Sequence, residues 1–438
     1  MEYIMTLLLN FMIAVTSTVN SSSTLWQTIN LAWEHSEEVK SAVLNYEKSK
    51  LEVDEYWGTF APKITGYWNY QRNPEVKVTF SPHIPQELQA LLGNSYKPES
   101  VVVRPSENYE MGLKLMQKIF DPSMIPGLKI TNLYREMAEL GLQKTKEMVA
   151  YLTTNLYLQL LFLTKQKDVL LKEDSELEIE KKKTEDEISL GLQPEWSKLR
   201  IDIEIQRHKK SLMEVETMIR YVSSELERLT GRKIFPAEPP VPSSLNKSAF
   251  STDESVDLKI TSLQKELSHQ MWKVQVGRLF PRINFMWNYS YQKNPGNFGK
   301  KENWMVMLQL TWTIFSGLSR YYEIRESSID EEIAGLDLTK RKKEAEIKLK
   351  RAIDEFFQQK KLLEVSRRTF DLARKNFSLV EENYKNGKAD VITYIDARNN
   401  LLKAKLSLIW NRYQLLLKRM NVYILSGKLE QFMEEIRQ

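Results

Sequence analysis

Apolar and polar residues alternate along four short stretches of the chain, residues 62–72, 108–120, 282–292 and 303–315. A period of two places successive side chains on opposite faces of a β-strand, so each stretch is expected to be a strand with one apolar and one polar face. The expected apolar faces consist of Ile64, Gly66, Trp68, Tyr70, Tyr109, Met111, Leu113, Leu115, Ile119, Ile283, Phe285, Trp287, Tyr289, Tyr291, Trp304, Val306, Leu308, Leu310, Trp312 and Ile314.

Long helical stretches surround each strand pair. Residues 25–58 and 253–278 carry apolar residues at helical spacing before a pair, and Thr24 is a suitable N-cap for the first of these helices. After each pair, a stretch without proline (127–190 or 318–386) is expected to be one long helix that turns and returns as a second helix. The pattern therefore predicts a long helical hairpin after each pair of strands.

The chain contains this arrangement twice, and the repeat defines its organisation. Phe60-Ala61-Pro62 precedes the first strand pair and Leu279-Phe280-Pro281 the second. Gly191 and Gly387 end the first helix of each hairpin, where a left-handed turn is expected. We divide the chain into a secretory signal segment (1–23), a first repeat (24–234) with its hairpin tip near 191, a Pro/Ser linker (235–250), a second repeat (251–428) with its tip near 387, and a C-terminal tail (429–438). Residues 73–107, with five prolines and no clear period, are predicted to be a loop.

Aromatic residues near the ends of the apolar faces favour strands that face lipid on one side and a wet lumen on the other. A soluble antiparallel sheet packed on a core would also alternate. In a membrane, four strands must find partners, because each unpaired backbone group in hydrocarbon costs about several kcal/mol. Two copies of the chain would supply eight strands and three copies twelve, and periodicity does not choose between them.

The last helix, before Ser426-Gly427, carries two adjacent apolar stripes. Two stripes allow a helix to contact a neighbour on each side, as a stave does in a cylinder, whereas one broad face on a globular core is the alternative. The stripes consist of Leu402, Leu406, Ile409, Tyr413, Leu416 and Met420, and of Ala397, Leu401, Ala404, Leu408 and Leu415.

The composition narrows the possible classes of function further. The chain has no cysteine, which excludes disulfides and thiol chemistry, and its net charge of +5 is spread among interspersed Lys and Glu, which does not favour nucleic-acid binding. The four histidines are scattered, and phosphate loops, dinucleotide glycines and zinc-protease motifs are absent from the sequence. We therefore expect no enzyme, no cofactor and no metal site. The apolar run after Met1 resembles a secretory signal, although no Lys or Arg precedes it, and a short anchor or a misplaced start is the alternative.

The chain resembles the TolC-like outer-membrane efflux proteins from about residue 25 to 428. The resemblance rests on the duplication together with Leu31-Ala-Trp-Glu-His35, Ile119-Phe120-Asp121, Ile314-Phe315-Ser316-Gly317, and above all Asn383 to Ile392 followed by Ile395-Asp396-Ala397. It implies a trimer whose twelve-stranded outer-membrane β-barrel continues into a long periplasmic α-helical barrel, in a bacterium of the Gram-negative type.

The resemblance also implies where the functional residues lie. The hairpin tips would contact an adaptor protein through Gly191, Leu192, Gln193, Gly387, Lys388 and Ala389. Tyr384, Thr393, Asp396 and Ser197 would line a gate at the same end, although Ser197, Thr393 and Ala389 depart from the charged residues that the family often has there.

The expected function is a passive exit duct of a tripartite efflux or type I secretion system. Its partners would be two further copies of the chain, a periplasmic adaptor (membrane fusion) protein, an inner-membrane pump and outer-membrane lipid. The alternative is a non-channel periplasmic coiled-coil scaffold or adaptor-binding structural protein, in which the strands form a soluble sheet.

Overall fold

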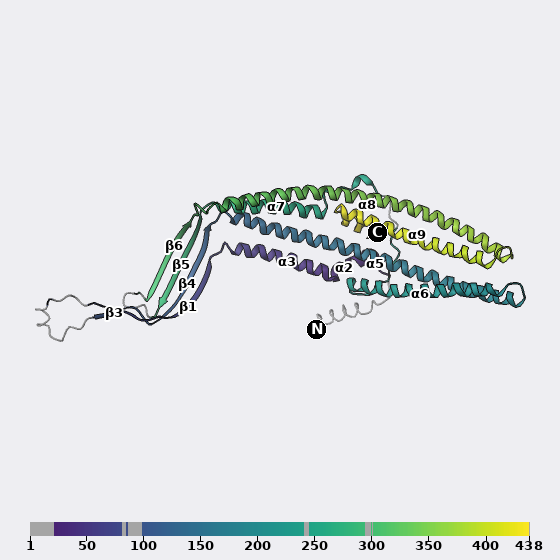
Figure 1. The fold of residues 1–438 in the computed structure, drawn as a ribbon, viewed down its shortest axis with the longest axis horizontal. Helices are drawn as coiled ribbons and strands as arrows, with labels where there is room; N and C mark the ends of the chain where they lie inside the picture. Colours follow the sequence, from purple (N-terminus) through teal and green to yellow (C-terminus); the bar gives the residue numbers. More distant parts are fainter. Residues whose placement is uncertain are drawn as a thin grey trace, which may run out of the picture. The chain divides into compact units, whose positions relative to one another are not determined.

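The computed structural model describes residues 22–80, 85, 99–240, 245–293, 299 and 301–437. Most of the predicted signal segment, residues 1–21, and part of the linker, residues 241–244, lie outside these ranges. The described chain forms two compact units (Figure 1). The helical unit comprises residues 22–47, 136–264 and 335–437, and the sheet unit comprises residues 48–135 and 265–334, with the gaps given above.

The sheet unit contains the four predicted strands as one antiparallel sheet in the order β1-β4-β5-β6. The strands are β1 (Lys63–Arg72), β4 (Glu107–Phe120), β5 (Arg282–Gln292) and β6 (Glu302–Thr311). The repeat therefore places its two strand pairs next to each other, with β4 and β5 paired in the centre. Strands β1 and β6 form the two edges.

The register confirms the predicted faces. One row of paired residues across the four strands consists of Gly66, Leu113, Tyr289 and Trp304. The next row on this face consists of Ile64, Leu115, Trp287 and Val306. Paired residues share a face, so these rows build one apolar face. Much of it is exposed in the single chain; Trp304, for example, is 70% exposed.

Two strand predictions were wrong. Strand β6 ends at Thr311 rather than at 315, and the indole Nε1 of Trp312 beyond it donates to the carbonyl of Leu279 at 3.0 Å. The segment 73–107, predicted as a loop, contains β2 (Val76–Phe80) and β3 (Glu99–Arg104), which pair with each other as a second, two-stranded sheet. Their β-branched valines favour strands, whereas the prolines between and around them hid the pattern.

The predicted first helix, 25–58, is divided into α2 (Leu25–His35) and α3 (Glu37–Gly58). Thr24 caps α2 as predicted, in a reciprocal capping box with Gln27. Ser36 adopts an extended backbone between the helices, and its hydroxyl accepts from the Val39 amide at 3.3 Å, so that it caps the next helix. The break therefore comes from a serine that offers the backbone an alternative partner.

The remaining helices follow the predicted hairpins. The first hairpin comprises α5 (Met124–Ser189) and α6 (Glu195–Thr230), and the second α8 (Ser319–Lys385) and α9 (Val391–Leu425), with α7 (Val256–Gly277) before β5. Among the helices of the described residues, none combines enough length with enough apolar character to span a bilayer. The predicted C-terminal tail contains a further helix, α10 (Leu429–Arg437).

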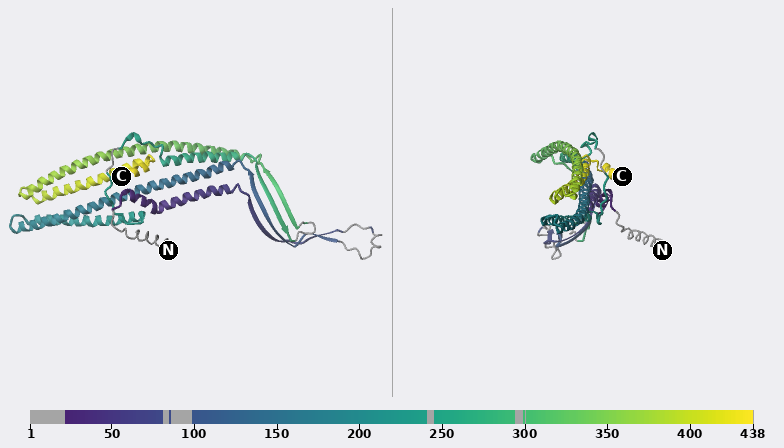
Figure 2. Two further views of the ribbon diagram at one scale, coloured as in Figure 1. Left: turned by 180° about the vertical axis from the view of Figure 1, so that it is seen from behind. Right: turned by 90° about the vertical axis from the view of Figure 1, so that its right-hand side faces the viewer.

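Within the helical unit the two hairpins lie side by side (Figure 2). The core gathers Leu25 and Ile29 of α2, Leu226 of α6 and Phe432 of α10. Tyr157 of α5 is fully buried in this core; its hydroxyl accepts from the Ala237 amide at 2.8 Å and lies within hydrogen-bonding distance of the carbonyls of Ser23, at 2.8 Å, and Ala237, at 2.7 Å. Tyr157 therefore ties the segment before α2 and the linker to α5.

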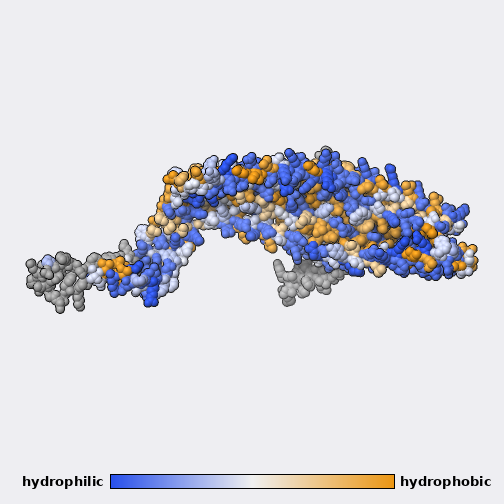
Figure 3. Space-filling view, in the orientation of Figure 1, coloured by the Kyte–Doolittle hydropathy of each residue, from blue (hydrophilic) through white to orange (hydrophobic). Residues whose placement is uncertain are grey.

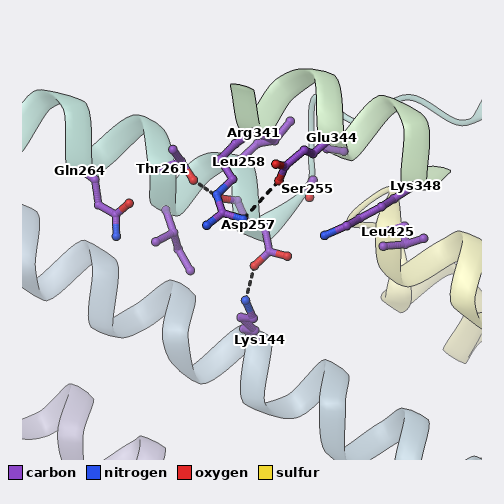
Figure 4. Close-up of a pocket in the computed structure, with 12 residues that line it drawn as sticks. Lys144, Ser255, Asp257, Leu258, Thr261, Gln264, Arg341, Glu344, Lys348 and Leu425 are labelled. Atoms are coloured by element: carbon purple, nitrogen blue, oxygen red, sulfur yellow. Dashed lines mark hydrogen bonds and ion pairs between the residues drawn. The ribbon is translucent and has the colours of Figure 1, made fainter. Parts of the chain in front are cut away.

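A pocket of about 350 Å³ lies in the helical unit between α5, α7 and α8 (Figure 4). In it Lys144 of α5 points to Asp257 of α7 and forms an ion pair with it, and Arg341 of α8 pairs with Glu344 at 3.3 Å. One turn along α5 from Lys144, Glu147 is only 7% exposed, and its Oε1 has no hydrogen bond within the described chain. Burial raises the pKa of Glu147 to about 7, with the Asp257 carboxylate adding to the effect.

Stability should depend on pH through Glu147. Between the ordinary value of 4.5 and about 7, the folded chain binds more protons than the unfolded chain, so stability falls as pH rises through this window. Glu147→Gln should therefore raise the free energy of unfolding by on the order of 1–3 kcal/mol at about pH 8 and change it little near pH 5. Thermal unfolding followed by circular dichroism at both pH values tests this. Glu139→Gln, an exposed change on the same helix, is the control, and equal gains at both pH values would contradict the role of Glu147.

Candidate functional site at the hairpin tips

Both hairpins turn through a glycine in the left-handed region, as predicted. Gly191 has φ of +69° and Gly387 of +70°, and a Cβ at either position would meet nothing within 4 Å. Each turn is closed by an equivalent backbone hydrogen bond of 2.8 Å. In the first turn the amide of Leu192 donates to the Glu187 carbonyl, and in the second the amide of Lys388 donates to the Asn383 carbonyl. Glycine is thus required by the backbone angle rather than by crowding.

The predicted adaptor contacts differ in exposure. Leu192 and Lys388 are exposed together with the turn glycines, and Leu192 is a large apolar side chain that the single chain leaves uncovered. Gln193 and Ala389 are half-buried. Among these predicted contacts, one exposed side chain is apolar and one is basic, and Leu190 and Trp196 beside the first turn add exposed apolar surface.

The return helices begin in different ways after the two turns. Asp390 caps α9 by accepting from the Thr393 amide at 2.8 Å, and its hydrogen bonds with Thr393 hold the pKa of Asp390 below its usual range. At the equivalent start of α6, Pro194 supplies no side-chain cap. Ser197 is buried there, and its hydroxyl donates to Gln193 Oε1 at 3.2 Å. Thr393 and Ser197 therefore serve the local helix starts in the single chain.

Tyr384 is 6% exposed and stacks on Tyr394 of α9, with ring centroids 4.7 Å apart. Lys183 of α5 places its Nζ 5.1 Å from the centre of the Tyr384 ring, a distance at which a cation is attracted by the ring face. Burial raises the pKa of Tyr384, and the charge of Glu180 adds to it. The predicted gate tyrosine thus lies between the two hairpins of one chain.

A small apolar cluster joins all four hairpin helices near the tips. It contains Leu177 of α5, Ile201 of α6, Tyr384 of α8 and Ile395 of α9, all buried. Such a cluster couples the hairpins, because separating them would return this apolar surface to water.

Arg398 crosses from α9 to α5 beside this cluster and is 4% exposed. Its Nε donates to Glu173 Oε2 at 2.6 Å, and its Nη2 donates to Glu176 Oε2 at 2.9 Å and to the Glu173 carbonyl at 3.0 Å. Burial opposes the charge of Arg398, but the carboxylates hold its pKa above the ordinary value. A buried arginine paired in this way is a strong lock between two helices.

The side chain of Asp396 is 60% exposed. It lies 3.8 Å from Nη2 of Arg200 on α6, so that its charge is partly balanced within the chain. Of the predicted gate residues, the structure therefore brings Tyr384 into the inter-hairpin cluster and leaves Asp396 at the surface beside an arginine.

Neither Arg398 nor Arg200 was predicted as a functional residue. A signal was present for Arg398, which lies four residues before Leu402 and so continues an apolar stripe with a charged residue. A charge in such a position must find a partner across the helix contact. The described residues contain no group of three or more His, Asp or Glu side chains that would hold a metal ion.

Comparison with solved structures shows the fold of outer-membrane channels. The CmeC outer membrane channel of Campylobacter jejuni matches with a TM-score of 0.74 at 12% identity, covering 94% of this chain and 89% of that one. VceC of Vibrio cholerae matches with 0.74 at 12% identity over 92% and 96%, and the open-state MtrE outer membrane channel of Neisseria gonorrhoeae with 0.72 at 13% identity over 92% and 89%. None of the curated proteins matches the chain.

The family model described as outer membrane efflux protein matches residues 253–428, the second repeat. The second repeat is thus similar to this family, in keeping with the resemblance to the TolC-like proteins. The predicted fold of strand pairs and long helices in two repeats is confirmed.

Removing the Arg398 lock should loosen the tips. Arg398→Gln would leave two carboxylates without their partner and should lower the protection of amides in α5 and α9 near the tips by on the order of 1–3 kcal/mol. Hydrogen exchange measured by mass spectrometry reports this segment by segment. Arg374→Gln is the control, because that exposed arginine of α8 approaches Asp371 and lies over the ring of Phe370, both within its own helix. Equal exchange in the two variants would show that Arg398 does not hold the hairpins together.

Proposed function

We propose that three copies of this chain form a passive exit duct across the outer membrane, which receives substrates from a periplasmic adaptor protein and an inner-membrane pump. The observation that carries the proposal is the four-stranded sheet, which has an exposed apolar face and two unpaired edges. A lipid bilayer accommodates such a face, and closure with other copies supplies the missing hydrogen bonds. Three copies would give twelve strands.

The apolar face supports a lipid-facing surface. Its exposed members include Trp68 on β1 and Trp304 on β6, the two edge strands, together with Leu308 and Leu310. A surface of this kind is unfavourable in water because large contiguous apolar patches favour association. The opposite face carries Tyr67, whose hydroxyl lies 3.2 Å from Glu110 and 3.3 Å from Asn288, as suits a wet lumen.

The helices support association of the same copies. Apolar side chains remain on the surface of the helical unit among the charged ones (Figure 3). Leu171 and Ile179 of α5 and Leu362 and Leu372 of α8 are exposed, so both hairpins have apolar surface left over in the single chain. Neighbouring copies on each side would cover it, as the two stripes of α9 suggest.

The tips supply the gate and the adaptor contact in this proposal. The adaptor would contact Gly191, Leu192, Gln193, Gly387, Lys388 and Ala389. The constriction would be surrounded by Tyr384, Thr393, Asp396 and Ser197. CmeC and MtrE, which share the fold, are described as outer membrane channels. In this proposal the pump supplies the energy for transport.

Detergent extraction and channel recording test the duct. The protein should leave the envelope only with detergent, run with the mass of three chains and form ion-conducting pores in planar bilayers. A water-soluble monomer that forms no pores would overturn the proposal and favour the periplasmic scaffold instead.

The charge at the proposed gate can be tested from both sides. Asp396→Ala should shift the pore's permeability ratio toward anions by roughly two-fold, because it removes a negative charge from each chain at the constriction. Arg200→Gln should shift it toward cations, because it frees Asp396 from its partner. Reversal potentials in a salt gradient give both values, with trimer mass as the check on assembly. Unchanged selectivity in both variants would remove Asp396 from the gate.

A further inference from the structure

The polar face of the sheet has an excess of positive charge. Its charged residues are Lys63, Lys114, Lys118 and Arg282 against Glu110, as the strand register places them. Nε of Arg282 lies 3.9 Å from Oδ1 of Asp121, and the Asp121 carboxylate also interacts electrostatically with Lys118. Within the described residues, Lys63 and Lys114 form no ion pair. The excess therefore centres on lysines of β1 and β4.

Methionines interrupt this polar face beside Lys63. Met116 is paired with Lys63 on one side and with Met286 on the other, and Met286 is paired with Met307. Three unbranched, polarizable side chains thus lie in one row across three adjacent strands. Such side chains adapt to apolar surfaces of different shapes.

A cavity of about 590 Å³ opens where these two features meet. Its lining includes Lys63, Lys118, Met116 and Met286, with polar uncharged Gln309 of β6. No carboxylate is among the described residues that line it. The volume is that of a site for a small organic molecule, and the lining combines apolar walls with two ammonium groups.

We propose that this cavity binds amphipathic organic anions, molecules with a compact apolar body and a carboxylate or sulfonate. The anionic group would pair with Lys63 and Lys118 while the apolar body lies on Met116 and Met286. The inference rests on the proposed function in one respect, that the polar face lines the duct. A cation is disfavoured by the lysines, and a small inorganic anion would make no use of the methionines.

Equilibrium dialysis of the full protein in lipid nanodiscs tests the site, with naphthalene sulfonate as the probe and empty nanodiscs subtracted. Naphthalene sulfonate should bind, and naphthylmethylammonium, which has the same ring but a positive charge, should not. Combined Lys63→Gln and Lys118→Gln should weaken binding about ten-fold. Lys114→Gln is the matched control, since it removes a charge from the same face but does not line the cavity, and it should change binding by less than about two-fold.

Two substitutions of Met286 test the contribution of the methionines to binding. Met286→Leu keeps the apolar volume and should preserve binding, whereas Met286→Gln makes the wall polar and should weaken it. Equal binding of the two probes, no effect of the paired lysine changes, or an equal effect of Lys114→Gln would each overturn the site. A protein that conducts ions in planar bilayers but binds no naphthalene sulfonate would overturn the site and leave the duct. A protein that binds the probe without conducting would retain the site and overturn the duct.

Discussion

Unsatisfied backbone hydrogen bonds at the edges of the four-stranded sheet are the constraint on which the rest of this molecule depends. Within the described residues, strands β1 and β6 have a neighbour on one side only, and in the proposed membrane setting a bilayer would offer no water to the other side. The helical hairpins meet a related constraint, because apolar side chains such as Leu171 and Leu372 stay exposed in the single chain. In the proposed duct, both constraints would be relieved by the same event, association with further copies, so one repeat would have to supply strands and hairpin together.

Charge is distributed unequally between the two units of the chain. At the tips, the exposed carboxylate of Asp396 is partly balanced by Arg200, and the buried charge of Arg398 is held by Glu173 and Glu176. On the polar face of the sheet, lysines outnumber carboxylates and two of them border an apolar cavity. In the proposed duct, a solute would meet the carboxylate of Asp396 at the tips and the lysines on the sheet, so that selection would combine two local filters.

Much of the fold was predictable because it rests on simple periods. Alternation located the strands, and Gly191 and Gly387 identified the left-handed turns. The errors came where local chemistry overrides a period: Ser36 caps a helix inside an otherwise continuous stretch, and valines form β2 and β3 among prolines. At the tips, the pattern indicated which residues lie there, but the pairing of Arg398 with α5 depends on how the two hairpins are aligned, which one sequence does not contain.

The two hairpin turns share their backbone geometry but not the anchoring of the helix that follows. Asp390 holds the first amides of α9, whereas α6 begins at Glu195 without a side-chain cap, a difference of about 1 kcal/mol in such helices. The first turn of α6 should therefore fray more readily than that of α9. In a closed ring of hairpins from identical chains, compliant and stiff tips would alternate around the axis, and an outward pull applied evenly to the ring would deform every second tip first.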